Sequence, residues 1–161
     1  MQCKDFHGEI HDVPESDFKT RASIYGIIFN EDKTKVLLVK HFDGYDYPGG
    51  GLKVGQKIDE ALKRELIEET GYELKNDSMQ LLHVATDLFY HNFKETAFQT
   101  ILVYYSATLT SFTNKKEAEK SASEEQYMGD AEWVSVSDVP SLKFYNAVDN
   151  VALIQQALER V

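Results

Sequence analysis

The segment with the clearest chemical content is Arg64-Glu-Leu-Ile-Glu-Glu-Thr-Gly71, which carries three glutamates within five residues. Its pattern predicts a helix over residues 58–70 that ends at the glycine. At about 100° per residue, Glu65 and Glu69 fall within roughly 20° of the first apolar residue of that helix. Carboxylates on a core-facing side are costly unless a positive charge balances them. Because hard divalent cations prefer oxygen ligands, the segment suggests a cation site.

The alternative is an ordinary solvated helix, whose carboxylates reach water and pair with Lys63 and Arg64. Two features favour the cation site. Three carboxylates crowd together, and a glycine-rich loop, DGYDYPGGGLKVGQ, stands directly before the helix. Glycines let the backbone approach a ligand closely, so this loop is suited to the other side of such a site.

The composition is that of a globular protein. The chain has 161 residues, of which 42% are hydrophobic and 27% are charged. We therefore predict one domain over residues 1–161, with residues 1–18 as an N-terminal arm or an edge strand. The formal net charge of −10 repels a nucleic-acid backbone, so we expect no nucleic-acid polymer as partner. A small anionic ligand would need a local cation.

We expect a cytoplasmic protein without membrane contact. No apolar stretch is long enough to span a membrane, and the N-terminus has no apolar core of a secretory signal. Cys3 is the only cysteine, so no internal disulfide can form, which fits a reducing compartment.

The remaining pattern is α+β, mostly antiparallel strands with one central and one terminal helix. Strands are predicted over residues 21–29 and 35–42 as a hairpin, and a short strand is predicted near Leu52–Val54. Residues 79–93 and 96–110 are expected to form an antiparallel pair, and residues 131–136 a last strand. Residues 111–130 read as a long loop, and the end of the chain reads as a helix.

From Gly50 to Tyr72 the chain reads GGLKVGQKIDEALKRELIEETGY, which resembles the signature of the Nudix hydrolases. That signature is Gly, five residues, Glu, seven residues, Arg-Glu, a bulky aliphatic, any residue, Glu-Glu, any residue, Gly and a bulky aliphatic. The positions that match with the correct spacing are Gly50, Arg64, Glu65, Leu66, Glu68, Glu69 and Gly71. The resemblance implies an α/β/α sandwich with a mixed, mostly antiparallel sheet, a central Nudix-box helix and a C-terminal helix.

The resemblance also implies an activity, which is hydrolysis of the diphosphate linkage in a nucleoside diphosphate derivative. Glu65, Glu69 and the backbone carbonyl of Gly49 would hold Mg²⁺ or Mn²⁺. Glu68 would hold an additional ion or receive the proton of the attacking water, and Arg64 would orient the carboxylates. Family members are often dimers, so a homodimer is compatible with this assignment.

Two positions depart from the family pattern in charge, and Tyr72 in place of the closing aliphatic is a third, milder change that should still pack. Gln56 stands where the family has a glutamate, and Lys53 stands where an acidic residue is common. Gln56 can accept a hydrogen bond from Arg64, but it brings no charge. These departures motivate an alternative, a Nudix-fold nucleotide-binding sensor with little or no turnover. A domain that uses the carboxylates only for a structural cation is a third reading.

The general base and the substrate pocket are less defined by the sequence. Some family members use a glutamate in the loop before the last strand, where Glu124 and Glu125 lie, but such loop glutamates are more often ordinary solvated charges, and Glu68 is the preferred base. Tyr47 and Tyr90 are candidates to stack on a nucleobase, as are Tyr45 and Phe89. Strand aromatics of this kind more often pack in a core.

Overall fold

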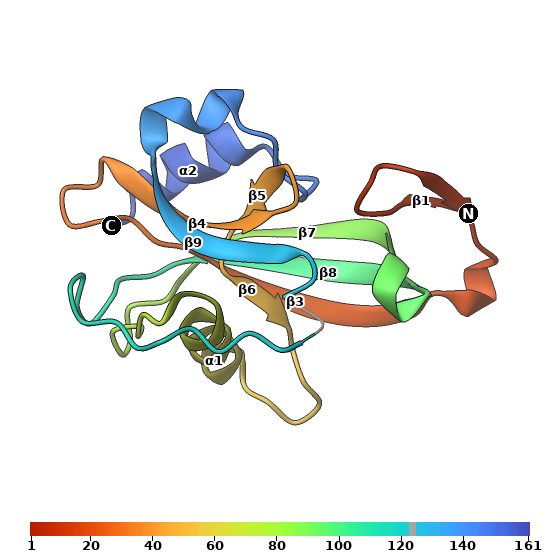
Figure 1. Ribbon diagram of the computed structural model, residues 1–161, viewed down its shortest axis with the longest axis horizontal. Coiled ribbons are helices and arrows are strands. Elements are labelled where there is room, and N and C mark those ends of the chain that lie inside the picture. Colours follow the sequence, from red (N-terminus) through yellow and green to blue (C-terminus); the bar gives the residue numbers. More distant parts are fainter. Residues whose placement is uncertain (123–124) are drawn as a thin grey trace.

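A computed structural model describes residues 1–122 and 125–161 of the chain. Within those residues, two β-sheets lie between two α-helices, with α2 above and α1 below them in Figure 1. In chain order the elements are β1 (Gln2–Lys4), β2 (Ile10–Asp12), the 3₁₀ turn η1 (Glu15–Asp17), β3 (Lys19–Ile27), β4 (Lys35–His41), β5 (Gly44–Asp46), β6 (Gly49–Gly51), α1 (Ile58–Thr70), β7 (Gln80–His91), η2 (Asn92–Lys94), β8 (Thr96–Ser106), β9 (Met128–Ser135), η3 (Val136–Ser141) and α2 (Asn150–Leu158).

The larger sheet of the described chain has the strand order β2-β1-β7-β8-β3-β6, and the smaller one has the order β5-β4-β9. The predicted antiparallel pair is confirmed, since β7 and β8 pair from Gln80–Ser106 to His91–Thr96. β3 runs parallel to β8 over its full length. The sheet is therefore mixed, as expected for an α/β/α sandwich.

The sequence predicts a hairpin for residues 21–29 and 35–42. The structure confirms the turn but not the pairing of the two strands. β3 and β4 meet at the single bridge Phe29–Val36 and then enter different sheets. The second half of β3 and most of β4 are buried, so both strands lie in the interior of their sheets. β8 provides nine consecutive pairs to β3, and β9 pairs with β4 in the other sheet.

The short strand predicted near Leu52–Val54 lies three residues earlier, in the glycines of β6. Val54 is fully exposed. β6 lies antiparallel against β3, and a Cβ at Gly49 would stand only 2.1 Å from the carbonyl oxygen of Ile24. Only glycine permits this approach, and for that reason the strand forms where side chains are absent.

The two helices cover two separate apolar cores. Leu62 and Leu66 of α1 pack with Ile24 and Leu37, whereas Leu153 and its neighbours in α2 pack against the other side of the strands. Alternating residues of β3 and β4 serve the two cores, because successive side chains of a strand point to opposite faces. Asp149 caps α2 by accepting a hydrogen bond from the Ala152 N–H at 3.0 Å.

Residues 1–12 form a hairpin at one end of the larger sheet (Figure 1). β1 pairs with β2 and meets β7 in parallel at Lys4–Phe89. The N-terminal segment is therefore a docked edge of the sheet.

The long loop before β9 follows α1 in Figure 1. The Lys116 N–H donates to the Gly71 carbonyl at 2.8 Å, and the Glu119 N–H donates to the Glu68 carbonyl at 2.8 Å. These bonds satisfy backbone carbonyls at the helix end, where Gly71 ends α1 in the left-handed conformation at φ 76°, as predicted. Among the described residues, the helices are too short or too polar to cross a membrane.

The contact between this loop and the end of α1 predicts unequal effects of two glycine substitutions. Gly71 and Gly55 have similar left-handed φ values of 76° and 79°, so alanine at either position carries strain of about 1–2 kcal/mol. A Cβ at Gly71 would also lie 2.0 Å from the Lys116 carbonyl oxygen, whereas a Cβ at Gly55 meets nothing within 4 Å. We expect Gly71→Ala to lower the free energy of unfolding, measured with urea, clearly more than Gly55→Ala. Equal losses would contradict this packing of the loop.

Candidate active site

Glu65 and Glu69 lie on the buried side of α1, with exposed fractions of 6% and 2%. They share that side with Ala61, Leu62 and Leu66, which are fully buried. This is the placement that the helical period predicts. Two carboxylates thus enter the interior next to an apolar core.

The strand that faces these carboxylates is β6. The Gly49 N–H donates to the Glu69 Oε2 atom at 2.9 Å. A Cβ at Gly50 would lie 2.7 Å from the Glu65 Oε1 atom, closer than such contacts are tolerated. The glycines therefore form a cradle of bare backbone for the two carboxylates.

Arg64 bridges two of the three glutamates. Its Nη2 atom lies 2.7 Å from the Glu65 Oε1 atom, and its Nη1 atom lies 2.9 Å from the Glu68 Oε2 atom. Nη2 also donates to the Gly51 carbonyl at 3.4 Å. Burial disfavours the charged guanidinium, but the two glutamates more than compensate and raise the pKa of Arg64. Arg64 thus holds Glu65 and Glu68 from the side of the helix.

The two departures from the family pattern have local partners. The Gln56 Oε1 atom accepts a hydrogen bond from the Lys53 N–H at 3.3 Å and closes the turn before α1. Arg64 is positioned by the neighbouring glutamates and Gly51 instead. Tyr72, which replaces an aliphatic residue, is buried and accepts a hydrogen bond from the Trp133 indole.

A cavity of about 180 Å³ opens from the carboxylates and is lined by residues of both sheets. Its lining residues are Phe6, Arg21, Ser23, Tyr25, His41, Asp46, Tyr47, Gly49, Gly50, Gly51, Glu65, Glu69, Asp87, Phe89, His91, Lys94, Thr100, Leu102, Tyr127, Met128, Tyr145 and Asn146. The β7 residues among them alternate along the strand, as one face of a sheet requires. The cavity therefore extends from an acidic end to an aromatic end.

Two basic side chains line the cavity, those of Arg21 and Lys94. Strand register places Arg21 beside Thr100, and the Arg21 Nε atom donates to the Thr100 hydroxyl at 3.2 Å. Its guanidinium also lies over the ring of Phe98, 4.4 Å from the centroid. These contacts hold the positive charge of Arg21 at the wall of the cavity.

The polar walls of the cavity include groups with shifted pKa values. Burial raises the pKa of Asp46 to about 6, although its carboxylate accepts hydrogen bonds from Asn146 and from the Tyr47 N–H. Burial lowers the pKa values of His41 and His91 to about 4, so both imidazoles are neutral at pH 7. Their Nδ1 atoms are buried and have no hydrogen-bond partner among the described residues.

The structure separates the tyrosines proposed for the nucleobase. Tyr47 lines the cavity but is 1% exposed and packs against Tyr104 and Phe144. Tyr90 stacks on His11 at 4.0 Å, away from the cavity-lining residues. The next residue back, Phe89, does line the cavity, because neighbouring strand residues face opposite sides.

The other aromatic and acidic candidates lie outside the cavity wall. The Tyr45 hydroxyl donates to Glu132. Glu125 is exposed in a turn, and Glu124 lies outside the described residues. Glu68 is partly exposed next to Arg64, beside the cavity rather than in its lining.

Several cavity residues were not among the sequence candidates, notably Arg21, His41, Asp46, His91 and Phe6. One signal was available. The alternation of strand residues puts His91 on the same face as Phe89, so one candidate implied the other. The other residues come from distant elements that the sequence pattern does not bring together.

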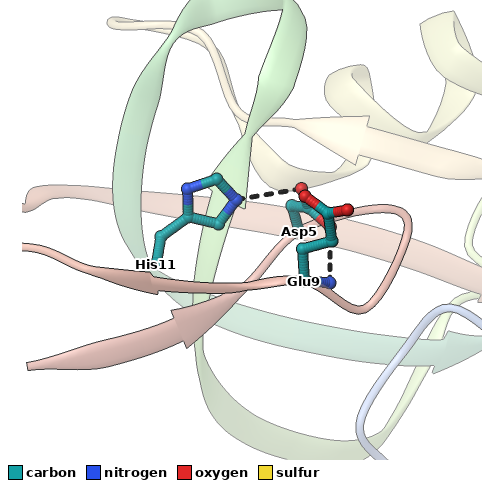
Figure 2. A group of neighbouring side chains, drawn as sticks. All are labelled: Asp5, Glu9 and His11. Carbon is teal, nitrogen blue, oxygen red and sulfur yellow. Dashed lines mark hydrogen bonds and ion pairs between the residues drawn. The ribbon is translucent and has the colours of Figure 1, made fainter.

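A second acidic group, Asp5, Glu9 and His11, lies in the N-terminal hairpin (Figure 2). The Asp5 carboxylate accepts hydrogen bonds from the backbone N–H groups of His7 and Glu9 and from the Asn92 amide, and it contacts His11 Nε2 at 2.9 Å. Burial alone would raise the pKa of Asp5, but these hydrogen bonds hold it well below its usual range. Asp5 thus organises the hairpin turn.

Comparison with known proteins agrees with this geometry. A family model described as the NUDIX domain matches residues 19–156, so the chain belongs to the Nudix family. A putative 8-oxo-dGTP diphosphatase of Bacillus subtilis (strain 168) is 46% identical over 48 residues, 29% of this chain and 32% of that protein. An RNA pyrophosphohydrolase of Wolbachia sp. subsp. Brugia malayi (strain TRS) is 32% identical over 89 residues, 53% of this chain and 52% of that protein. The matches thus span from about a third to a half of these relatives.

Solved structures share the fold. The NUDIX domain of Shewanella oneidensis NrtR, complexed with ADP ribose, superposes with a TM-score of 0.63 at 20% identity, over 92% of this chain and 93% of that one. A NUDIX hydrolase from Nitrosomonas europaea gives a TM-score of 0.61 at 18% identity, over 88% and 89% of the two chains. These likenesses confirm the predicted α/β/α architecture.

The cradle at β6 predicts a contrast between Gly50→Ala and Gly51→Ala. A Cβ at Gly50 displaces the Glu65 carboxylate, whereas a Cβ at Gly51 meets nothing within 4 Å. If the carboxylates hold a divalent cation, Gly50→Ala should weaken Mn²⁺ binding by roughly 10-fold or more, and Gly51→Ala by less than about twofold. Titration calorimetry measures both affinities. Equal affinities in the two variants would show that the Glu65 position does not matter for the ion.

The raised pKa of Asp46 predicts a pH-dependent stability. The folded protein binds this proton more tightly than the unfolded chain, so Asp46 lowers stability as pH rises from its ordinary pKa of 3.8 to about 6. Asp46→Asn removes this loss and keeps an oxygen to accept the same hydrogen bonds. We expect the melting temperature of the variant, relative to that of the wild type, to increase as pH rises through that range. Above the range the variant should remain the more stable protein.

The comparison of variant with wild type isolates Asp46. His41 and His91, whose pKa values are lowered to about 4, act in the opposite sense and destabilise the fold as pH falls below their ordinary value of 6.5. They contribute equally to both proteins. A difference in melting temperature that does not change with pH would contradict the assignment.

Proposed function

We propose that this protein is a divalent-metal-dependent pyrophosphohydrolase that cleaves the diphosphate linkage of a nucleoside diphosphate derivative. The observation that carries the proposal is the pair Glu65 and Glu69, buried against the glycine backbone of β6 at one end of a cavity. Family membership supports the same reaction. So do the names of the two curated relatives, a diphosphatase and a pyrophosphohydrolase.

The residues present suit Mg²⁺ or Mn²⁺. Carboxylates of Glu65 and Glu69, with the Gly49 carbonyl, offer the oxygen ligands that these ions prefer, and the cradle at Gly50 leaves the carboxylates room. Glu68 is our candidate ligand for an additional ion. When bound, the metal neutralises the diphosphate and acidifies a coordinated water.

The protein's own residues would divide the remaining work. Arg64 keeps Glu65 and Glu68 in place through two ion pairs. Arg21 and Lys94, which line the cavity beyond the carboxylates, would bind substrate phosphate oxygens. Glu68 is our candidate to receive the water's proton. Glu125, exposed in its turn, would have to reach the site by movement of its loop.

The aromatic end of the cavity supports a nucleotide as the substrate. Phe89 and Tyr127 line that end and are suited to a planar base. In this geometry Tyr47 would pack behind the cavity wall without stacking on the base. Tyr90, on the opposite face of β7, would have no contact with the substrate. Nucleoside triphosphates, dinucleoside polyphosphates and nucleotide sugars are the candidate substrates.

The first experiment is product release from a panel of these compounds, with Mg²⁺, with Mn²⁺ and with a chelator. We expect at least one compound to be hydrolysed only when metal is present. In that assay Glu69→Gln should lower kcat by roughly 100-fold or more, because one direct ligand loses its charge. Gln can still accept the Gly49 N–H hydrogen bond, so the melting temperature should change little.

Glu60→Gln is the matched control, since Glu60 is exposed on the same helix. Its rate should equal that of the wild type. A Glu69→Gln variant that retains the wild-type rate would refute the ligand assignment. If no compound is hydrolysed but one raises the melting temperature, the protein is a nucleotide-binding sensor instead.

A further inference from the structure

The N-terminal hairpin lies outside the residues that the family model matches, which begin at residue 19. It nevertheless contributes a side chain to the cavity of the candidate active site. Phe6, in the turn between β1 and β2, lines the same cavity as Glu65 and Glu69. The hairpin therefore forms part of the candidate active site as well as the edge of the sheet.

Phe6 stands in a cluster of aromatic rings drawn from distant parts of the chain. Its ring centroid lies 4.7 Å from that of Phe89 and 5.2 Å from that of His91, both in edge-on geometry. It stacks on Tyr127 at 5.3 Å, and Tyr127 in turn stacks on Phe93. Phe6, Phe89, His91 and Tyr127 thus form an aromatic part of the cavity wall.

The position of Phe6 is held firmly by its neighbours. The Phe6 N–H lies 3.4 Å from the Asn92 side-chain oxygen. Asp5 is almost fully buried and contacts His11 (Figure 2), and the same oxygen accepts a hydrogen bond from the Asn92 amide. The other oxygen of Asp5 accepts hydrogen bonds from the backbone N–H groups of His7 and Glu9, so both oxygens hold the turn that presents Phe6 to the cavity.

The same end of the cavity contains two polar atoms that lack a partner. His41 and His91 are 9% and 5% exposed, they line the cavity, and their Nδ1 atoms have no hydrogen-bond partner in the described part of the chain. Both rings lie near Tyr127, at 5.8 and 6.3 Å between centroids. A buried polar atom without a partner is unfavourable, so an occupant with its own donors or acceptors would be favoured here.

We propose that Phe6 is a specificity-determining residue that contacts the nucleobase of the substrate, with His41 and His91 facing the polar edge of that base. The proposal rests on the nucleotide substrate proposed above. A nucleobase combines a flat face for the aromatic rings with a polar edge for the imidazoles. An aliphatic group would satisfy the rings but leave both nitrogens buried and unpaired.

The test measures binding without metal and without turnover. The probes are the four common nucleoside 5′-monophosphates, with ribose 5-phosphate as the probe that lacks a base. We expect the wild type to bind at least one monophosphate more tightly than ribose 5-phosphate. Phe6→Leu keeps a bulky side chain in the wall but loses the π-face. It should lower the affinity for that monophosphate by roughly 5-fold or more. Its affinity for ribose 5-phosphate should not change.

Phe6→Ala should lower the affinity for the preferred monophosphate at least as much as Phe6→Leu does. Ile10→Ala is the matched control, because Ile10 lies on β2 of the same hairpin and is 61% exposed. Its affinities should equal those of the wild type.

Two results would overturn the inference. One is a wild type that binds no monophosphate better than ribose 5-phosphate. The other is a Phe6→Leu variant whose affinity for the preferred monophosphate is unchanged, or falls equally for both kinds of probe. Neither depends on hydrolysis, so failure of the catalytic proposal would be seen separately in the panel of substrates.

Discussion

The contact between the inner side of α1 and the glycines of β6 is the constraint on which the site depends. Two carboxylates are buried there beside an apolar core, and the opposing strand has no side chains to displace them. Glycine costs conformational entropy in a strand, and Gly49 in addition lies where any Cβ would strike β3. Glycine is needed at these positions despite this cost, because a residue with a Cβ would keep the helix and the strand from approaching so closely.

Charged side chains of opposite sign lie at different parts of the cavity. The Arg64 guanidinium contacts Glu65 and Glu68, and together with Glu69 these carboxylates offer oxygen atoms of the kind that suit a cation. Arg21 and Lys94 line the cavity further along. In the proposed function, a metal at the carboxylates and these basic side chains would together offset the negative charge of an anionic ligand.

The far end of the cavity depends on tertiary contacts of another kind. Phe6 is brought there by a hairpin that is anchored through a buried aspartate, and the rings it meets come from β7 and from the segment before β9. The Nudix family model does not include this hairpin. The carboxylate end of the cavity follows the family pattern, while Phe6 at the aromatic end comes from residues that the family model does not match.

The sequence by itself determined α1 and what it carries. Its boundaries, its end at Gly71 and the inward placement of Glu65 and Glu69 follow from a 3.6-residue period, which is a local property. The pairing of β7 with β8 was also predictable, because a short connection joins them. The Nudix family followed from the spacing of the same helix residues.

Only the tertiary structure decided the rest. β3 pairs with β8 over nine residues and not with β4, its neighbour in sequence, and β6 forms at glycines rather than at Leu52. The strand alternation that turns Phe89 into the cavity turns Tyr90 out of it. Strand partners and the convergence of Phe6 and Arg21 on one cavity depend on contacts between distant segments, for which a single sequence has no periodic signal.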